Sequence, residues 1–158
     1  MRILLVKYLN INRPGYICPI VHEESVGAMK RIKLVIREPS IKELAGRELN
    51  LLLDDRANLI DAITEVDKII NSKGVFPVPG YGSFLHMIYN PVKNRFYEQV
   101  VITIVIKPGQ LLNVRENPKK TLPGGIKVYL TPMGGCCFNQ EEVIDYSEFL
   151  KALERYKV

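Results

Sequence analysis

The stretch NLIDAITEVDKIINSKG, residues 58–74, carries the best-defined helical pattern of the chain, and it lies among segments whose apolar residues alternate. Its apolar residues recur at the spacing of one helix face: Leu59, Ile60, Ile63, Val66, Ile69 and Ile70. We expect Asn58 to cap this helix, with Asp61 in the first turn and Gly74 just after the end. One main helix among strands predicts an α+β fold.

Five segments around this helix complete the predicted body. RIKLVI (31–36) and RELNLLLD (47–54) alternate as half-buried strands, and EPSIKELAG (38–46) connects them as a wide hairpin because its proline interrupts strand pairing. QVVITIVI (99–106) is apolar on both faces, so it is predicted to be a central strand. IKVYLTPM (126–133) alternates again and is predicted to be the last strand.

Residues 75–98 are the least regular part of the chain. FLHMIY and RFYEQVVITIVI flank NPVKN, which predicts a β-hairpin whose turn holds Asn90 and Pro91. His86 then lies within a predicted strand. This region also concentrates five aromatic residues: Tyr81, Phe84, Tyr89, Phe96 and Tyr97. Two interpretations stay open, because aromatic residues form partner surfaces and also pack beneath their own hairpin.

The two ends of the chain look like additions to a body spanning residues 29–135. Residues 1–28 contain RILLVKYLNI, which predicts an extra strand, and Met29 opens a segment that resembles a protein start. Residues 136–158 are predicted to be helical from about Asp145, with Phe149, Leu150, Leu153 and Tyr156 on one stripe. This stripe needs a surface to cover, on the same chain or on a partner.

Several functional classes receive no support from the sequence. VVITIVI (100–106) is too short to span a bilayer, and three cysteines without a disulfide framework predict a cytoplasmic location. Cys136 and Cys137 lack the neighbouring ligands or base that a zinc site or a reactive thiol requires, so neither a metal nor a catalytic site is predicted. The net charge of +5 permits an acidic protein partner, whereas no nucleic-acid-binding signature accompanies it.

The order of the predicted elements is that of the β-grasp, the fold of ubiquitin. Four pieces carry a closer resemblance, and together they look like the MoaD/ThiS sulfur-carrier family: KLVIREPSIKELAGRELNLLL, ANLIDAI, VVITIVIKPGQLL and LPGGIKVYLTPMGG. The resemblance covers roughly residues 30–135. It implies a mixed β-grasp sheet packed on one main helix, here with an added hairpin in residues 75–98 and a C-terminal helix.

The resemblance also implies a function for Gly134 and Gly135. In such carriers the terminal glycine is adenylated by a ubiquitin-activating-type enzyme that uses ATP, and the carrier itself binds no cofactor. The resulting thiocarboxylate supplies sulfur for molybdopterin, thiazole or transfer RNA, or the same terminus is joined to a lysine. Glycine suits a tail that enters a narrow cleft, because it has no side chain.

Gly135 is followed by Cys136 and the rest of the chain, so its carboxyl group is tied up in a peptide bond. Two hypotheses therefore remain. In the first, the protein is a precursor that is cut between Gly135 and Cys136 and then acts as a carrier or modifier. In the second, it is a β-grasp protein-binding module whose glycines form only a turn and whose terminal helix packs back on the body.

Overall fold

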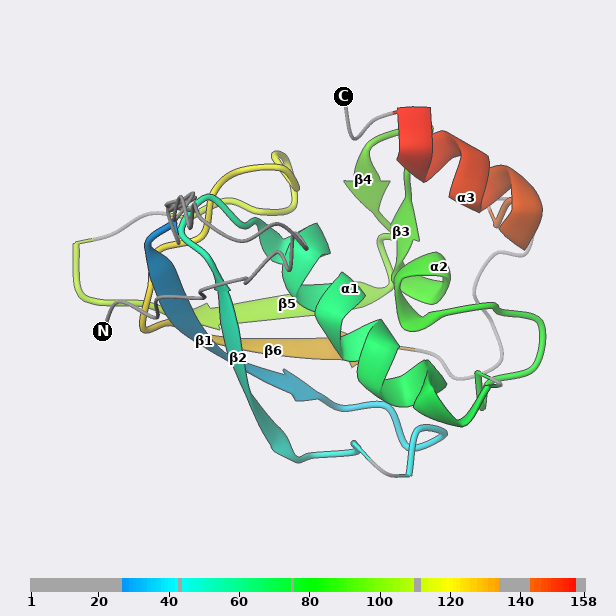
Figure 1. Cartoon of the computed structure of the whole chain (residues 1–158), viewed down its shortest axis with the longest axis horizontal. Helices are drawn as coiled ribbons and strands as arrows, with labels where there is room; N and C mark the ends of the chain where they lie inside the picture. Colours follow the sequence, from blue (N-terminus) through cyan, green and yellow to red (C-terminus); the bar gives the residue numbers. More distant parts are fainter. Residues whose placement is uncertain (1–26, 43, 75, 110–111, 134–142, 156–158) are drawn as a thin grey trace, which may run out of the picture.

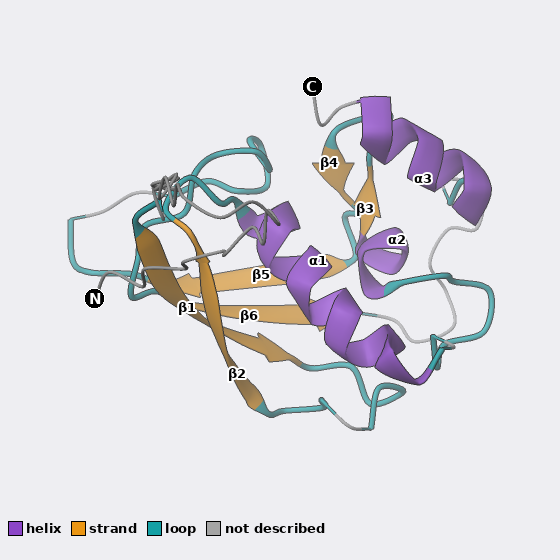
Figure 2. Ribbon diagram, in the orientation of Figure 1, coloured by secondary structure: helices purple, strands orange, loops and turns teal. Residues whose placement is uncertain are grey.

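The computed structural model describes residues 27–155 except for residues 43, 75, 110–111 and 134–142. A four-stranded mixed sheet forms the centre, and a long helix crosses one of its faces (Figure 1). The sheet contains β1 (Met29–Ile36), β2 (Glu48–Asp54), β5 (Val100–Val105) and β6 (Lys127–Pro132) in the order β2-β1-β6-β5. The remaining elements are α1 (Leu59–Ile70), a 3-10 turn (Asn71–Lys73), α2 (Phe84–Ile88), β3 (Tyr89–Asn90), β4 (Arg95–Phe96) and α3 (Tyr146–Arg155). The α+β class predicted from the sequence is confirmed (Figure 2).

The strand directions in the sheet come from two antiparallel pairs that meet along one parallel pair. β1 pairs with β2, and β5 with β6, in antiparallel registers. β1 and β6 lie side by side in parallel, with Leu34 opposite Val128. β1 and β6 are the first and last strands of this sheet along the sequence. α1 lies in the connection between the β1–β2 pair and the β5–β6 pair.

The core lies between the sheet and α1. Ile32, Leu34 and Ile36 point from β1 into it and are fully buried, as the alternation of that strand predicts. α1 contributes most of its predicted stripe, although Ile60 is only partly buried and Ile69 is 48% exposed. Its first turn holds a capping box between Asn58 and Asp61. Gly74 follows the 3-10 turn with a φ of 90°, which glycine adopts without strain.

Two predicted elements are wrong. FLHMI is the short helix α2, not a strand, so the predicted hairpin shrinks to β3 and β4. QVVITIVI contributes an edge strand instead of a central one, because within the described residues β5 pairs with β6 alone. β6, with its clear alternation, takes the central position.

The ends of the chain differ in what the structure describes. The predicted extra strand of the N-terminal extension lies within residues 1–26, outside the described residues. The C-terminal helix is present as α3. In the part of the chain that the structure covers, no helix is both long and apolar enough to cross a bilayer.

Candidate functional site

The predicted conjugation tail begins just where the described chain stops. Gly134, Gly135 and Cys136 all lie outside the described residues. The last described residue before them is Met133, whose backbone N–H donates to the carbonyl of Gln99 at 2.7 Å. The ladder between β5 and β6 therefore holds the chain up to the residue before the glycines.

The five aromatic residues of the predicted partner surface do not form one. Four of them, Phe84, Tyr89, Phe96 and Tyr97, are buried in the core, and Tyr81 is partly buried. The structure thus has the alternative arrangement, in which these rings pack beneath their own segment. α2, which carries Phe84, packs beside α1 and continues into the β3–β4 hairpin.

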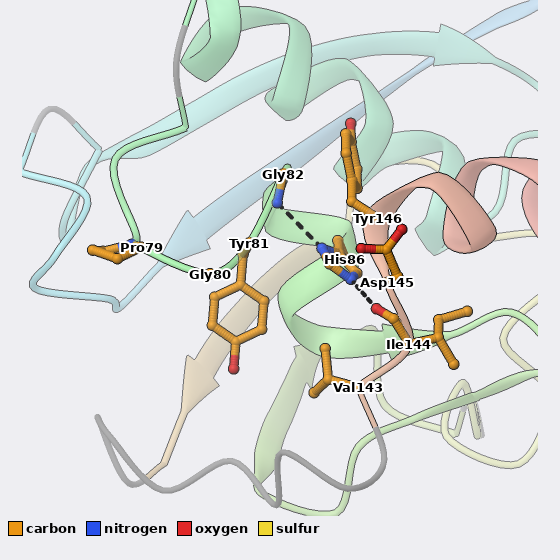
Figure 3. A pocket seen from close by; sticks show the side chains of 9 residues that line it. All are labelled: Pro79, Gly80, Tyr81, Gly82, His86, Val143, Ile144, Asp145 and Tyr146. Carbon is orange, nitrogen blue, oxygen red and sulfur yellow. Dashed lines mark hydrogen bonds between the residues drawn. The ribbon is translucent and has the colours of Figure 1, made fainter.

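His86 joins the body to the chain that returns after the glycines, residues 143–155, which we call the C-terminal segment. Its Nδ1 accepts from the backbone N–H of Gly82 at 3.2 Å, and its Nε2 lies 2.7 Å from the carbonyl oxygen of Ile144 (Figure 3). Both contacts are satisfied together only when the imidazole is neutral and carries its proton on Nε2. The ring is buried, with only 2% of the residue exposed.

Two aromatic rings of the C-terminal segment pack against His86. The Tyr146 ring lies 5.1 Å from the His86 ring, and the Phe149 ring lies 4.9 Å from it, measured between centroids. Phe149 is 1% exposed and belongs to the hydrophobic core. Tyr146 lies so close to Gly82 that an added Cβ there would come within 2.3 Å of the ring. The C-terminal segment is therefore packed into the body.

A cleft lies beside the contact between His86 and the C-terminal segment. It has a volume of about 670 Å³ and is lined by Pro79–Gly82, His86 and residues 143–146. Both nitrogens of His86 are already engaged. Asp145 accepts from Ser147, whose hydroxyl is the main reason that the pKa of Asp145 is lowered. Among the described residues, no group of three or more His, Cys, Asp or Glu side chains is placed to hold a metal ion.

A methyl group at position 82 is expected to displace the C-terminal segment. In Gly82→Ala the new Cβ collides with the Tyr146 ring, so the amides of α3 should exchange with solvent much faster, at least about tenfold. Hydrogen exchange followed by mass spectrometry measures this effect. Adding Tyr146→Ala to Gly82→Ala removes the clash. The interpretation fails if the increase in α3 exchange in the double variant equals or exceeds the sum of the increases in Gly82→Ala and Tyr146→Ala alone.

A second buried polar group, Asp67 on α1, explains why α2 forms. Its carboxylate accepts from the backbone N–H groups of Phe84 at 2.6 Å and Leu85 at 3.0 Å, the first residues of α2. Ser83 adds a local cap by accepting from the His86 N–H at 3.1 Å. Burial raises the pKa of Asp67 to about 6, while the two N–H donors act in the opposite direction.

This raised pKa predicts a specific pH dependence of stability. Below the ordinary value of 3.8 the carboxyl is protonated in both the folded and the unfolded chain. Between pH 3.8 and about 6 only the unfolded chain ionises, so the folded state loses stability as the pH rises. The loss is of order ~3 kcal/mol.

Denaturant titrations of the wild type and Asp67→Asn from pH 4 to pH 7 test this prediction. The difference between their free energies of unfolding should shift against the wild type as the pH rises, and level off above about pH 6. If the free energies of unfolding of the two proteins change in parallel with pH, Asp67 ionises equally in the folded and unfolded states.

The face of the sheet opposite α1 is open to solvent. Its outward residues on β2, β5 and β6 include Leu52, Val101 and Val105, which are 60%, 44% and 56% exposed. We call this surface the outer face. Its outward charges are Arg31, Lys33, Glu48, Asp54 and Lys127.

The charges on the outer face form a cluster around Glu48. The carboxylate of Glu48 lies 3.1 Å from the Lys33 ammonium and 2.7 Å from that of Lys127, and these contacts, Lys127 first, lower the pKa of Glu48. The guanidinium of Arg37 stacks over the Tyr129 ring at 4.5 Å. The outer face is thus mixed apolar and basic, with one carboxylate shared between two lysines.

Comparison with known proteins adds no assignment. No protein-family model, curated protein or solved structure matches this chain.

Proposed function

We propose that this chain is a β-grasp protein-binding module that keeps the residues beyond Gly135. The strand order supports the β-grasp assignment: two antiparallel pairs meet along the parallel pair β1–β6, and α1 crosses one face. The α2 and β3–β4 region and α3 are additions at one end of that sheet (Figure 1).

The observation that carries the proposal is the docking of the C-terminal segment. Phe149 fills a place in the hydrophobic core, and Ile144 satisfies a buried nitrogen of His86. A cut after Gly135 would leave these contacts to a detached fragment. The segment therefore acts as part of the fold, as expected of a chain that works without releasing its glycines.

The outer face is the surface on which we expect a protein partner. Leu52 on β2 and Val101 and Val105 on β5 provide apolar contact area at the two edges of this face, and the basic residues of β1 and β6 between them favour an acidic partner. Such binding would weaken as salt is added, because these charges are exposed. A cytoplasmic location remains part of this proposal.

Affinity capture from the native host with matched baits tests the binding face. Leu52→Asp places a carboxylate in the outer face, whereas Ile69→Asp changes a similarly exposed aliphatic residue on α1. Proteins that bind the wild type and Ile69→Asp, but are reduced at least about tenfold on Leu52→Asp, fit the proposal. If every partner binds all three baits equally, the outer face is not the binding surface.

A sulfur carrier or protein modifier is the second candidate, and the path of β6 favours it. β6 is a central strand, and Met133 leads from its end directly into Gly134 and Gly135. In this candidate a protease cuts before Cys136, and an adenylating partner enzyme then activates the new terminus with ATP. The two candidates differ in one measurable property, the mass of the mature chain.

A further inference from the structure

β5 combines the strongest strand-forming sequence of the chain with an edge on which no other described strand pairs. All of its residues, VVITIV, are β-branched, and none is charged. Among the described residues its only strand neighbour is β6. Natural edge strands are usually protected by charges, prolines or bulges, and β5 has none of these within its length.

The free edge presents the backbone groups of Ile102 and Ile104. In an antiparallel pair, the backbone N–H and C=O groups of every second residue point toward the partner strand. The hydrogen bond from the Met133 N–H to the Gln99 carbonyl shows which residues of β5 these are. Residues 101, 103 and 105 therefore face β6, and the N–H and C=O groups of residues 102 and 104 face away. The guanidinium of Arg115 donates to the carbonyl of Val100, which occupies the start of the edge.

We propose that β5 pairs with β5 of a second copy of this chain, in an antiparallel register centred on Thr103. The two four-stranded sheets then form one continuous sheet. Ile102 of each copy lies opposite Ile104 of the other, which pairs the free backbone groups. On the outer face Val101 lies opposite Val105, and the two Thr103 side chains meet at the twofold axis.

This register places compatible side chains opposite each other. β-Branched and Thr–Thr cross-strand pairs are favourable, and no like charges face each other within β5. The side chains of Ile102 and Ile104 are only partly buried in one copy, so pairing covers apolar surface on both faces of the strand. The pairing is limited to Val101–Val105, because the guanidinium of Arg115 and the turn ending at Val100 occupy the backbone groups of Val100.

The occupant that we infer is the second copy because the strand is self-complementary in this register. An isologous contact of this kind closes after two copies, so it gives a dimer and not a fibre. It is independent of the proposed function and leaves the outer face available, since both copies present that face on the same side of the joined sheet.

Charge substitutions at Thr103 test the register directly. In Thr103→Lys two lysines meet at the twofold axis, and in Thr103→Glu two glutamates meet there, so each variant alone should dimerise at least about tenfold more weakly. An equimolar mixture of the two variants should restore the dimer, because each lysine then faces a glutamate. Asn50→Lys, on the outer face but on β2, should dimerise like the wild type.

Light scattering coupled to size-exclusion chromatography, over a range of concentrations, gives the masses, and circular dichroism confirms folding. The proposal is overturned if the wild type stays monomeric at the highest concentration. A monomer is expected if another segment of the same chain pairs with β5. A dimer equally stable in Thr103→Lys, Thr103→Glu and the wild type also overturns it. Should the variants not fold, hydrogen exchange of the wild type decides: the amides of Ile102 and Ile104 must become more protected as the protein concentration rises.

Discussion

Lys30→Met is expected to lower the free energy of unfolding by about 3–5 kcal/mol. Lys30 points from β1 into the protein, where its ammonium donates to the carbonyls of Asp55 and Ala57, each at 2.7 Å, and of Leu122 at 2.6 Å. The residue is 6% exposed, so water does not replace the lost donor readily. Methionine preserves the length of the side chain and removes the ammonium donor from all three carbonyl groups, of which that of Ala57 still accepts from the backbone N–H of Leu122.

Lys33→Met is the matched control for this substitution. Lys33 lies three residues further along β1 with its side chain 53% exposed and paired with Glu48, so its loss should cost only a small fraction as much. Denaturant titration with both variants measures the difference. Equal losses at the two positions would mean that the ammonium of Lys30 does not hold the 55–57 turn and the Leu122 loop to β1.

Phe149→Ala is expected to release the C-terminal segment from the body. Removing a fully buried phenylalanine side chain lowers the free energy of unfolding by about 3–5 kcal/mol. The neighbouring rings of Tyr146 and His86 cannot fill the resulting cavity unless they move. Because α3 meets the body mainly through this joint, the loss should appear first as faster hydrogen exchange in α3, with α1 still protected.

Leu150→Ala serves as the control, because Leu150 neighbours Phe149 on α3 but is 43% exposed. Its effect on α3 exchange should be small, since little buried surface is lost. The docking of the C-terminal segment would be contradicted if α3 stayed as protected in Phe149→Ala as in the wild type.

Elements with a clear period could be predicted from the sequence. The alternation in β1, β2 and β6 and the 3.6-residue stripe of α1 report directly on which side of each element is buried. The capping box of Asn58 and Asp61 is equally local, since both partners lie within one turn. The helical stripe of the C-terminal segment predicted α3 and the burial of Phe149, whereas Leu150 is 43% exposed and Tyr156 lies outside the described residues.

Features that depend on distant partners could not be predicted. α2 is capped by Asp67, which precedes it by 17 and 18 residues, so FLHMIY by itself looks like a strand. The edge position of β5 depends on which strands pair, and a strand that is apolar on both faces does not reveal this. Lys30 begins the inner face of β1 just before the predicted strand, which starts at Arg31, so its buried role was not predicted.

The contact between His86 and the C-terminal segment could not be predicted for the same reason. His86 and Ile144 are 58 residues apart, and nothing near either residue indicates that they meet. The stripe containing Phe149 did predict that the C-terminal helix needs a surface, but the sequence left open whether that surface belongs to the chain or to a partner. The structure supplies it from Gly82, His86 and the core.

The central claim is that the chain keeps the C-terminal segment as part of its fold. Intact mass spectrometry of the protein purified under native and then denaturing conditions from its own host measures this directly. The account predicts one species that contains the residues after Gly135, with no form ending at Gly135. A mature chain that ends at Gly135, with a carboxylate or a thiocarboxylate, would contradict the account and establish the carrier or modifier instead.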